Sequence, residues 1–223
     1  WAGEIPKWDV SQIRPSGARL KTFGGRASGP APLIDLFNFA VNTFKAASNR
    51  RLSSLECHDL MCYIGQIVVV GGVRRSAMIS LSNLSDGRMR HAKSGNWWET
   101  AGHRALANNS VCYTEKPDSE TFMREWLSLV ESKSGERGVF NRQACKALAV
   151  RSGRRDPNHE FGTNPCSEIS LRPYQFCNLT EVVVRATDTL KDIKDKVEIA
   201  TILGTIQSTY TKFPYLRKIW QRN

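Results

Sequence analysis

Four side chains that could act together in catalysis lie in one short stretch, FGTNPCSEISLRPYQFCNLTEVVVR, which covers residues 161–185. Asn164 precedes a proline, and a residue before proline is biased toward extended geometry. In an extended backbone alternate side chains share a face, so we expect Asn164, Cys166 and Glu168 to point to the same side. The pattern predicts a thiol, a carboxylate and an amide at one site.

A second thiol follows close behind. Cys177 comes shortly after Cys166, and Arg172-Pro173-Tyr174 between them is typical of a turn. We therefore expect the chain to fold back and to bring Cys177 beside Cys166.

Three kinds of chemistry use such groups. A structural zinc site is not expected, because the chain has no CxxC or HxxxH pair. A cysteine protease needs an imidazole near the thiol, and His159, the nearest in sequence, falls in a predicted polar turn, although a distant histidine could fold in. Dithiol redox chemistry fits a carboxylate beside a thiol. The structural alternative is two buried cysteines and a solvated glutamate.

The segment NPCSEISL followed by FCNLTEVVVR resembles the active-site segment of ribonucleotide reductases, specifically the adenosylcobalamin-dependent class II enzymes. The resemblance implies that Cys166 becomes a thiyl radical and abstracts the 3′-hydrogen of the ribose. It also implies that Glu168 is the base on the 3′-hydroxyl and that Asn164 holds the substrate hydroxyls. Cys177 would be half of the dithiol that supplies two electrons and a proton as the 2′-hydroxyl leaves as water.

General chemistry agrees with these roles. S–H and activated ribose C–H bonds are close in strength, so a thiyl radical can take a hydrogen and later return it. Such a radical must be kept from water, which favours a closed site on a rigid loop. The short spacing of Cys166 and Cys177 resembles the cobalamin-dependent class, whereas class I large subunits usually have a longer insert. A class I large subunit is the alternative enzyme.

Composition sets the context for this site. The 223 residues can bury one substantial core, and 40% hydrophobic with 24% charged residues is ordinary for a globular domain. The longest aliphatic run, residues 67–70, is too short to span a bilayer. Six cysteines without a dense framework, and no secretory pattern, predict a reducing, cytoplasmic location. Because the first residue is Trp1, we expect an excerpt from a longer reading frame.

The net charge is +11, from 32 Lys and Arg against 21 Asp and Glu. A basic surplus attracts nucleic acids, membrane surfaces and nucleotide phosphates alike. The positive residues are dispersed, and no tract resembles a nucleic-acid-binding arm, so we do not expect direct nucleic-acid binding. An inactive nucleotide- or nucleic-acid-binding module on a reductase scaffold is the alternative of a different class.

A glycine-rich basic loop spans residues 15–30. Glycines interleaved with Arg19, Lys21 and Arg26, with Ser28 nearby, suit a loop that approaches phosphate. Neither GxxxxGK[ST] nor GxGxxG occurs, and such a loop is commonly only a connection. The segment GARLKTFGGRASGP resembles a familiar reductase segment, however, and this implies a nucleotide contact.

A second loop, GGVRRSA at residues 71–77, resembles the reductase loop that carries information from the effector nucleotide to the substrate base. Gly72, Arg74 and Arg75 are the candidate contacts that this resemblance implies. A solvated arginine pair on a turn is the alternative.

Helices and a few strands must position these groups. Spacing of apolar residues predicts a helix whose core stripe includes Leu33, Leu36, Phe37, Ala40, Val41 and Phe44. Ser53 and Glu56 form a capping-box pattern that opens a second helix to about residue 69, with Cys57 and Cys62 structural. We also predict a strand at 108–113, a shorter helix that carries Cys145, and a buried strand at 182–184. A helix is predicted from Asp118, with apolar residues Phe122, Met123, Trp126, Leu127 and Val130. The last helix is predicted from about Asp188, with the inward-facing residues Leu190, Ile193, Val197, Ala200 and Leu203.

Strands interleaved with amphipathic helices predict an α/β fold. The resemblance implies that residues 1–223 are part of the ten-stranded α/β barrel of ribonucleotide reductases, with Cys166 on an internal loop. It further implies adenosylcobalamin as cofactor, a ribonucleotide substrate, a deoxynucleotide effector and a thioredoxin-type reductant. The loop sequences most resemble those of the enzymes that reduce ribonucleoside triphosphates. We expect the cysteine partner of Cys177 before Trp1, and we expect neither a metal site nor a membrane span.

Overall fold

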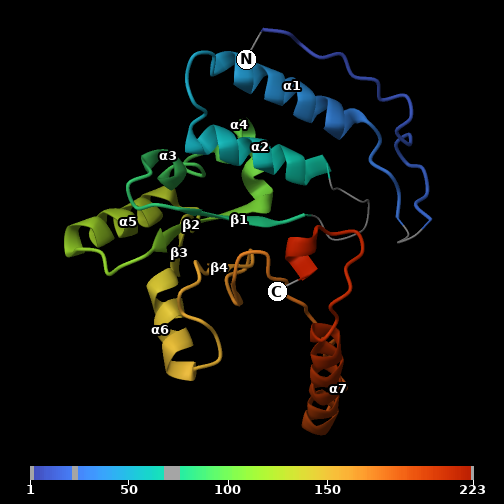
Figure 1. Ribbon diagram of the computed structural model, residues 1–223, viewed down its shortest axis with the longest axis vertical. Helices are drawn as coiled ribbons and strands as arrows, with labels where there is room; N and C mark the ends of the chain where they lie inside the picture. The colour runs from blue at the N-terminus through green and yellow to red at the C-terminus, as the bar shows by residue number, and fades with distance from the viewer. Residues whose placement is uncertain (1–2, 22–24, 68–75, 222–223) are drawn as a thin grey trace.

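The computed structural model describes residues 3–21, 25–67 and 76–221 of the chain. Its centre is a three-stranded parallel sheet in the order β1-β2-β3 (Figure 1). The strands are β1 (Met78–Ser82), β2 (Ala107–Tyr113) and β3 (Gly138–Asn141). The strand predicted at 108–113 is therefore confirmed as β2, which is paired along both of its edges.

The pairing register determines what each face of β2 carries. Asn108 pairs with Ile79 of β1, and Ser110 pairs with Gly138 of β3. Side chains alternate between faces along a strand, so Asn108, Ser110 and Cys112 share one face while Asn109, Val111 and Tyr113 share the other. Val111 is fully buried.

Helices cover one side of the sheet. They are α1 (Ala31–Ala46), α2 (Ser54–Ile67), the short α3 (Gly87–Arg90) and α4 (Trp97–Thr100), and the 3-10 helix η1 (Gly102–Leu106). Both predicted long helices are confirmed here, and α1 packs on α2 (Figure 1). The capping box is also confirmed: Ser53 N donates to Glu56 Oε2 at 2.8 Å, and Glu56 N donates to Ser53 Oγ at 3.3 Å.

The predicted core stripe of α1 is confirmed in part. Leu36 is buried, and Phe37 packs against the ring of Trp8, with the ring centroids 5.1 Å apart. Phe44, however, is 37% exposed, because it lies on the rim of this helix layer.

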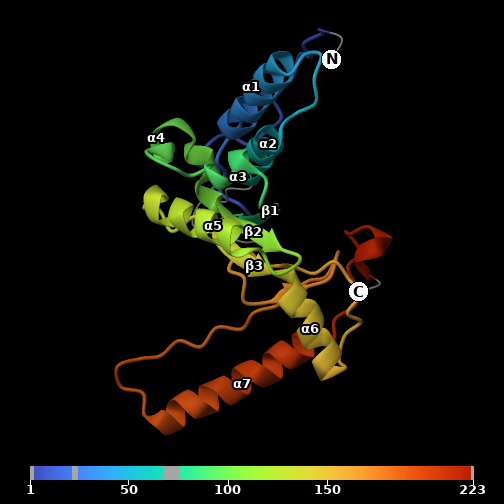
Figure 2. The same ribbon diagram turned by 90° about the vertical axis from the view of Figure 1, so that its left-hand side faces the viewer.

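The opposite side of the sheet holds α6 (Arg142–Ser152) and a short antiparallel hairpin formed by β4 (Gly162–Thr163) and β5 (Ser170–Leu171) (Figures 1 and 2). The helix begins directly after β3, where the Asn141 side chain accepts a hydrogen bond from Ala144 N at 2.9 Å. It ends at Gly153, whose φ of +61° is the left-handed conformation that glycine adopts without strain.

The helix α5 (Ser119–Ser132) connects β2 to β3, and its Asp118 cap confirms the predicted start. Its apolar stripe does not face the core. Phe122, Met123, Trp126, Leu127 and Val130 are all exposed, and the buried side chains are Glu125 and Ser128. The face that packs inward instead carries the Glu125 carboxylate, which two buried or half-buried arginines hold.

These ion pairs tie α5 to the sheet and to α3. Arg137 donates from Nε to Glu125 Oε2 at 2.9 Å and from Nη2 to Oε1 at 2.8 Å, and Arg90 Nε donates to Oε1 at 2.5 Å. Arg137 Nη1 also donates to Ser82 Oγ at 2.8 Å. A buried guanidinium and carboxylate that are fully paired in this way hold three elements in one arrangement.

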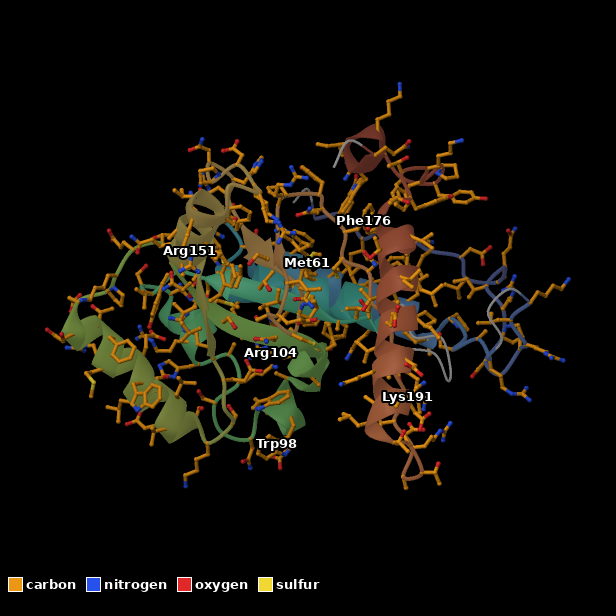
Figure 3. The ribbon with its side chains drawn as sticks, turned by 90° about the horizontal axis from the view of Figure 1, so that it is seen from below. Met61, Trp98, Arg104, Arg151, Phe176 and Lys191 are labelled. Atoms are coloured by element: carbon orange, nitrogen blue, oxygen red, sulfur yellow. The ribbon has the colours of Figure 1, made fainter. Side chains whose placement is uncertain are left out.

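Two predictions for the last quarter of the chain are wrong. Residues 182–184 form no strand, and Val183 and Val184 are exposed. Helix α7 (Leu190–Ser208) forms as predicted behind a Thr189–Asp192 capping box, but none of its residues, all of which the structure describes, is buried. Figures 2 and 3 show α7 standing apart from the sheet, with side chains such as Lys191 extending away from it. The chain ends in the 3-10 helix η2 (Lys218–Gln221).

In the part of the chain that the structure describes, every helix is too short or too polar to cross a bilayer.

We predict that Glu125→Gln lowers the free energy of unfolding by about 3–5 kcal/mol, because it leaves two guanidiniums without a counter-charge in a buried place. Urea unfolding followed by circular dichroism measures this. The matched control is Glu120→Gln on the same helix, where the pair with Arg124 is mostly exposed, and a loss of at most about 0.5 kcal/mol is expected. Equal losses in the two variants would contradict this interpretation of the α5 network.

Candidate active site

Three of the four residues predicted to carry the chemistry, Asn164, Cys166 and Glu168, lie on the β4–β5 hairpin. Gly162 pairs with Leu171 and Thr163 with Ser170, and the ladder continues through Asn164 N, which donates to Ile169 O at 3.3 Å. The chain therefore reverses over residues 165–168. Ser167 N donates to Asn164 O at 2.9 Å, and Ser167 has a φ of +67°. The predicted extended geometry from Asn164 to Glu168 is wrong, because the segment is a turn.

The turn nevertheless brings two of the predicted groups together. Asn164 Nδ2 donates to Glu168 Oε1 at 2.5 Å, while Asn164 Oδ1 accepts from Ile169 N at 3.1 Å and lies 3.3 Å from Thr163 Oγ1. The side chain of Asn164 is buried within the hairpin, with the residue only 7% exposed. One amide thus closes the turn and holds the carboxylate, as Asx side chains commonly do in turns.

The base of the hairpin is fixed to the fold by burial and by cations. Phe161 is among the most deeply buried side chains of the described residues, at 1% exposed, and its carbonyl accepts from Arg142 Nε of α6 at 2.7 Å. On the other strand the Ser170 carbonyl accepts from Arg155 Nη1 at 2.7 Å, and Ser170 Oγ lies 3.2 Å from the Cys145 sulfur. Both strands are therefore attached to α6 or to the loop that follows it.

The tip of the hairpin is attached to the sheet. Asn108 Nδ2 of β2 donates to the carbonyl of Pro165 at 2.9 Å. The sequence offered no sign of this contact, because it joins residues far apart in the chain and Asn108 belongs to no motif.

Cys166 lies at the outer end of the turn as an exposed free thiol. Within the described residues no hydrogen bond joins its sulfur to Glu168 or to Cys177. Of the three side chains expected on one face, the structure joins Asn164 and Glu168 directly and leaves the sulfur open to solvent.

Cys177 is also an exposed free thiol. The predicted turn before it is confirmed, because Gln175 N donates to Arg172 O at 3.1 Å and Tyr174 has a φ of +63°. Cys177 lines a cavity of about 580 Å³ together with Arg155, Tyr210 and Phe213, and Cys166 is not among the lining residues. The structure thus gives Cys177 an accessible pocket of its own and does not pair the two sulfurs.

The glycine-rich loop folds back on itself. Gly17 N donates to Ala27 O at 2.9 Å, and Leu20 N donates to Gly25 O at 3.0 Å. Arg19 and Arg26 are bridge partners across this ladder, so their side chains leave the backbone on the same face.

The predicted contacts of this loop differ in exposure. Arg19, Lys21 and Arg26 are exposed, and Arg26 Nη1 also donates to Gly17 O at 2.9 Å. Ser28 is half-buried and lines a cavity of about 370 Å³ beneath the loop. Gly29 has a φ of +79°, and a Cβ there would lie 2.9 Å from Ser16 N, so this close approach requires glycine.

Of the effector-type loop, only Ser76 and Ala77 belong to the described residues. Gly72, Arg74 and Arg75 lie outside the described residues. Ser76 and Ala77, which follow them, line a cavity of about 1010 Å³ between α1, α2 and η1.

The walls of this cavity are aromatic. Phe39 and Tyr63 stack with ring centroids 4.0 Å apart, and His103 stacks on Tyr63 at 4.6 Å.

A buried carboxylate lies behind these rings. Asp59 accepts from Arg104 Nε at 2.6 Å, and His103 Nε2 lies 3.1 Å from Asp59 Oδ1. Burial alone would raise the pKa of Asp59, but hydrogen bonds from Arg104, His103 and His58 outweigh burial and hold that pKa well below its usual range. This carboxylate is a fixed negative charge at the edge of the cavity.

The cysteines predicted to be structural fit that role where they are buried. Burial, with the negative charge of Asp59, raises the pKa of the Cys62 thiol to about 11, and burial also raises the pKa of Cys112. Cys57 is exposed instead. Among the described residues, no three His, Cys, Asp or Glu side chains lie close enough together to hold a metal ion.

Comparison with known proteins places the sequence of this chain in a family. Residues 7–44, which hold the glycine-rich loop and most of α1, match a family model described as B12-dependent ribonucleotide reductase, insertion domain. No solved structure matches the chain.

The chain is also similar to curated proteins named adenosylcobalamin-dependent ribonucleoside-triphosphate reductase. It is 36% identical to that of Lacticaseibacillus paracasei over 78% of this chain and 23% of the relative. It is 31% identical to that of Lactobacillus acidophilus over 96% of this chain and 29% of the relative. It is 35% identical to that of Levilactobacillus brevis over 78% of this chain and 23% of the relative.

The chain therefore spans about a quarter of the length of the relatives it matches. The similarity covers most of this chain, and it agrees with the resemblance of the NPCSE and FCNL motifs. The chain belongs to the adenosylcobalamin-dependent, or class II, ribonucleotide reductases, and corresponds to one segment of such a protein.

Proposed function

We propose that this chain acts as the radical-bearing segment of a reductase that converts ribonucleoside triphosphates to 2′-deoxyribonucleotides with adenosylcobalamin as cofactor. The observation that carries the proposal is the turn at residues 164–168. One short turn carries an exposed thiol, at Cys166, and a carboxylate, at Glu168, that the Asn164 amide holds at 2.5 Å, in a chain 36% identical to a protein named as such a reductase. We expect the enzyme to work in the cytoplasm.

Cys166 is the group of this chain that would meet the cofactor. The peptide that carries it is attached to β2, which suits a thiol that must give up a hydrogen atom to a neighbouring group without moving. Its sulfur is exposed, so the proposed radical role requires the rest of the barrel to exclude water from it. When bound, adenosylcobalamin supplies the radical that takes this hydrogen atom. The thiyl radical of Cys166 then abstracts the 3′-hydrogen of the ribose.

The remaining steps balance with the groups at hand. Glu168 accepts the proton of the 3′-hydroxyl as the 2′-hydroxyl leaves as water, which is general base catalysis. Cys177 and a second thiol supply two electrons and two hydrogens and become a disulfide: one hydrogen leaves as the proton of the water formed from the 2′-hydroxyl, and the other is added at C2′. Glu168 then returns its proton to the 3′-oxygen. Cys166 returns the hydrogen atom to C3′. The sum is one ribonucleotide and one dithiol converted to one deoxyribonucleotide, one disulfide and one water.

The accessible position of Cys177 supports its redox role. It lines an open cavity of about 580 Å³ instead of the protein core, so a small thioredoxin-type dithiol, or a flexible segment carrying one, can reach it. Thiol–disulfide exchange requires such access.

We further propose that the described sheet is part of the ten-stranded barrel of the family. Helix α7 exposes apolar side chains on more than one side, among them Leu190, Val197, Ile199, Ile202, Leu203 and Ile206. A helix that is apolar on several sides is normally buried in a larger core. The parallel strands with α5 as their crossover are also the unit from which α/β barrels are built.

Nucleotide binding outside the active site is proposed for the two basic loops. Arg19 and Arg26 leave one face of the loop ladder side by side, and like charges in such a pair are unfavourable unless an anion lies between them. Phosphate binding by Arg19, Lys21, Arg26 and Ser28 would provide that anion. Gly72, Arg74 and Arg75 would contact a deoxynucleotide effector at the cavity that Ser76 and Ala77 line.

The first test measures deoxyribonucleotide formation by the complete reading frame, with and without adenosylcobalamin. We expect activity only with the cofactor, and Cys166→Ala should reduce it to background because no other group can carry the radical. Cys57→Ala is the control, since Cys57 is an exposed thiol on α2, and it should retain activity. Turnover by Cys166→Ala would refute the radical role.

Glu168→Gln tests the base. Glutamine keeps the shape and still accepts from Asn164 Nδ2, but it cannot take a proton, so kcat should fall by about 100- to 10,000-fold. Steady-state kinetics measure this change against Glu181→Gln, a nearby exposed carboxylate that should leave kcat unchanged. A kcat within twofold of the parent in Glu168→Gln would assign the base to another residue.

Cys177→Ser should separate hydrogen abstraction from reduction. We expect exchange of a label at C3′ to continue while repeated formation of deoxyribonucleotide stops, because the two electrons are no longer available. Mass spectrometry of recovered substrate and product measures both. The control is Cys57→Ser, and sustained turnover by Cys177→Ser would exclude its redox role.

A further inference from the structure

A side chain of the central strand holds the peptide that carries Cys166. Asn108 of β2 is half-buried, and its Nδ2 donates to the Pro165 carbonyl at 2.9 Å. That carbonyl belongs to the peptide unit whose nitrogen is the backbone nitrogen of Cys166.

The orientation of the Asn108 amide is fixed by a second contact. A carbonyl oxygen only accepts, so Nδ2 must face Pro165 and Oδ1 must face the other way. There Ser110 Oγ lies 2.9 Å from Asn108 Oδ1 and donates to it. Ser110 is 2% exposed, so water does not compete for this hydrogen bond.

The neighbouring strand leaves room for this serine. Gly138 of β3 pairs with Ser110, and a Cβ at position 138 would lie 2.7 Å from Ser110 Oγ. Any larger residue would displace the hydroxyl. Gly138, Ser110 and Asn108 therefore form one chain of contacts that leads from β3 to the Cys166 peptide.

The turn needs an external restraint of this kind. Ser167 adopts a left-handed φ of +67°, which costs energy for a residue with a side chain and persists where the surroundings determine it. The short ladder of β4 and β5 provides few backbone hydrogen bonds. Among the described residues, the side-chain hydrogen bond from Asn108 is the one that reaches the tip from the sheet.

We propose that Asn108 is a positioning residue for Cys166, an inference that rests on the proposed radical role of that cysteine. Asn108 fixes the 165–166 peptide, and through it the direction in which the sulfur meets the substrate. A small displacement of a reacting group can reduce the rate by up to about 100-fold, so loss of this hydrogen bond should lower kcat by about 10- to 100-fold with little change in KM.

The discriminating variant is Asn108→Asp. Aspartate keeps the shape of the side chain and still accepts from Ser110, but it cannot donate to Pro165. Hydrogen exchange of the 223-residue chain should show the amides of Ser167 and Ile169 exchanging about 2- to 10-fold faster, the range expected for the loss of one hydrogen bond. The amide of Val111 in the middle of β2 should exchange as in the parent.

The matched pair is Asn108→Ala against Asn109→Ala. Asn109 is the next residue of the same strand, faces the other side of the sheet, and its side-chain amide makes no hydrogen bond to the described residues. Asn109→Ala should leave Ser167 and Ile169 exchange unchanged. If Asn108→Asp does not fold, Ser110→Ala decides, because it frees the Asn108 amide without adding a charge and should accelerate the same two amides.

Each result has one meaning. Unchanged exchange at Ser167 and Ile169 in the folded variants, or equal acceleration at Val111, overturns the proposal. Local acceleration with kcat at the parent value in the complete reading frame also overturns it. If the parent reading frame itself forms no deoxyribonucleotide while exchange is locally faster, the proposed function fails and the restraint of the turn stands.

Discussion

The whole site depends on side chains that hold a turn which the backbone cannot hold alone. Two strands of two residues each provide few hydrogen bonds, and the chain must still reverse with a left-handed serine at its tip. Burial of Phe161 fixes one end, and the amide of Asn164 closes the middle. Because side chains from several elements add to the few backbone hydrogen bonds, the position of Cys166 depends on contacts at distant points of the fold.

Polar groups are placed differently on the two sides of the sheet. The helix side holds charged groups that are paired, such as Asp59 with Arg104 and Glu125 with Arg137. The face of β2 toward the hairpin carries the neutral hydrogen bond of Asn108 with Ser110. These ion pairs fix α2 to η1 and α5 to the start of β3, whereas a neutral hydrogen bond fixes the hairpin tip.

Local signals in the sequence predicted local structure well. The capping box at Ser53 and Glu56 and the periodic apolar residues of α1 depend only on neighbours within a few residues, so α1 and α2 were predictable. The same periodicity in α5 predicted a helix but not its buried face. There Arg137, which lies beyond the end of the helix, binds Glu125 and turns the acidic face inward.

In the candidate site, too, local sequence signals were informative and tertiary contacts were not predictable. The residue types around Cys166 indicated the chemistry and the family, because short motifs preserve them. The turn geometry was not predictable, since a positive φ at Ser167 follows from tertiary restraint and not from any preference of serine. The Asn108 contact was missed for the same reason, as it joins residues 57 apart that share no motif.

The hydrogen-bond capacity of Asn164 shows that its two proposed tasks are compatible. A side-chain amide has two N–H donors and one acceptor oxygen. In the hairpin the oxygen accepts from Ile169 N, and one donor holds Glu168 Oε1. The second N–H remains available for a ribose hydroxyl.

Under the proposed mechanism, Glu168 likewise keeps its second oxygen, Oε2, for a proton from the substrate. The substrate therefore does not have to break the Asn164–Glu168 hydrogen bond in order to bind. It can add to a pair of groups that the turn has already brought together, and this preorganisation reduces the rearrangement that catalysis requires.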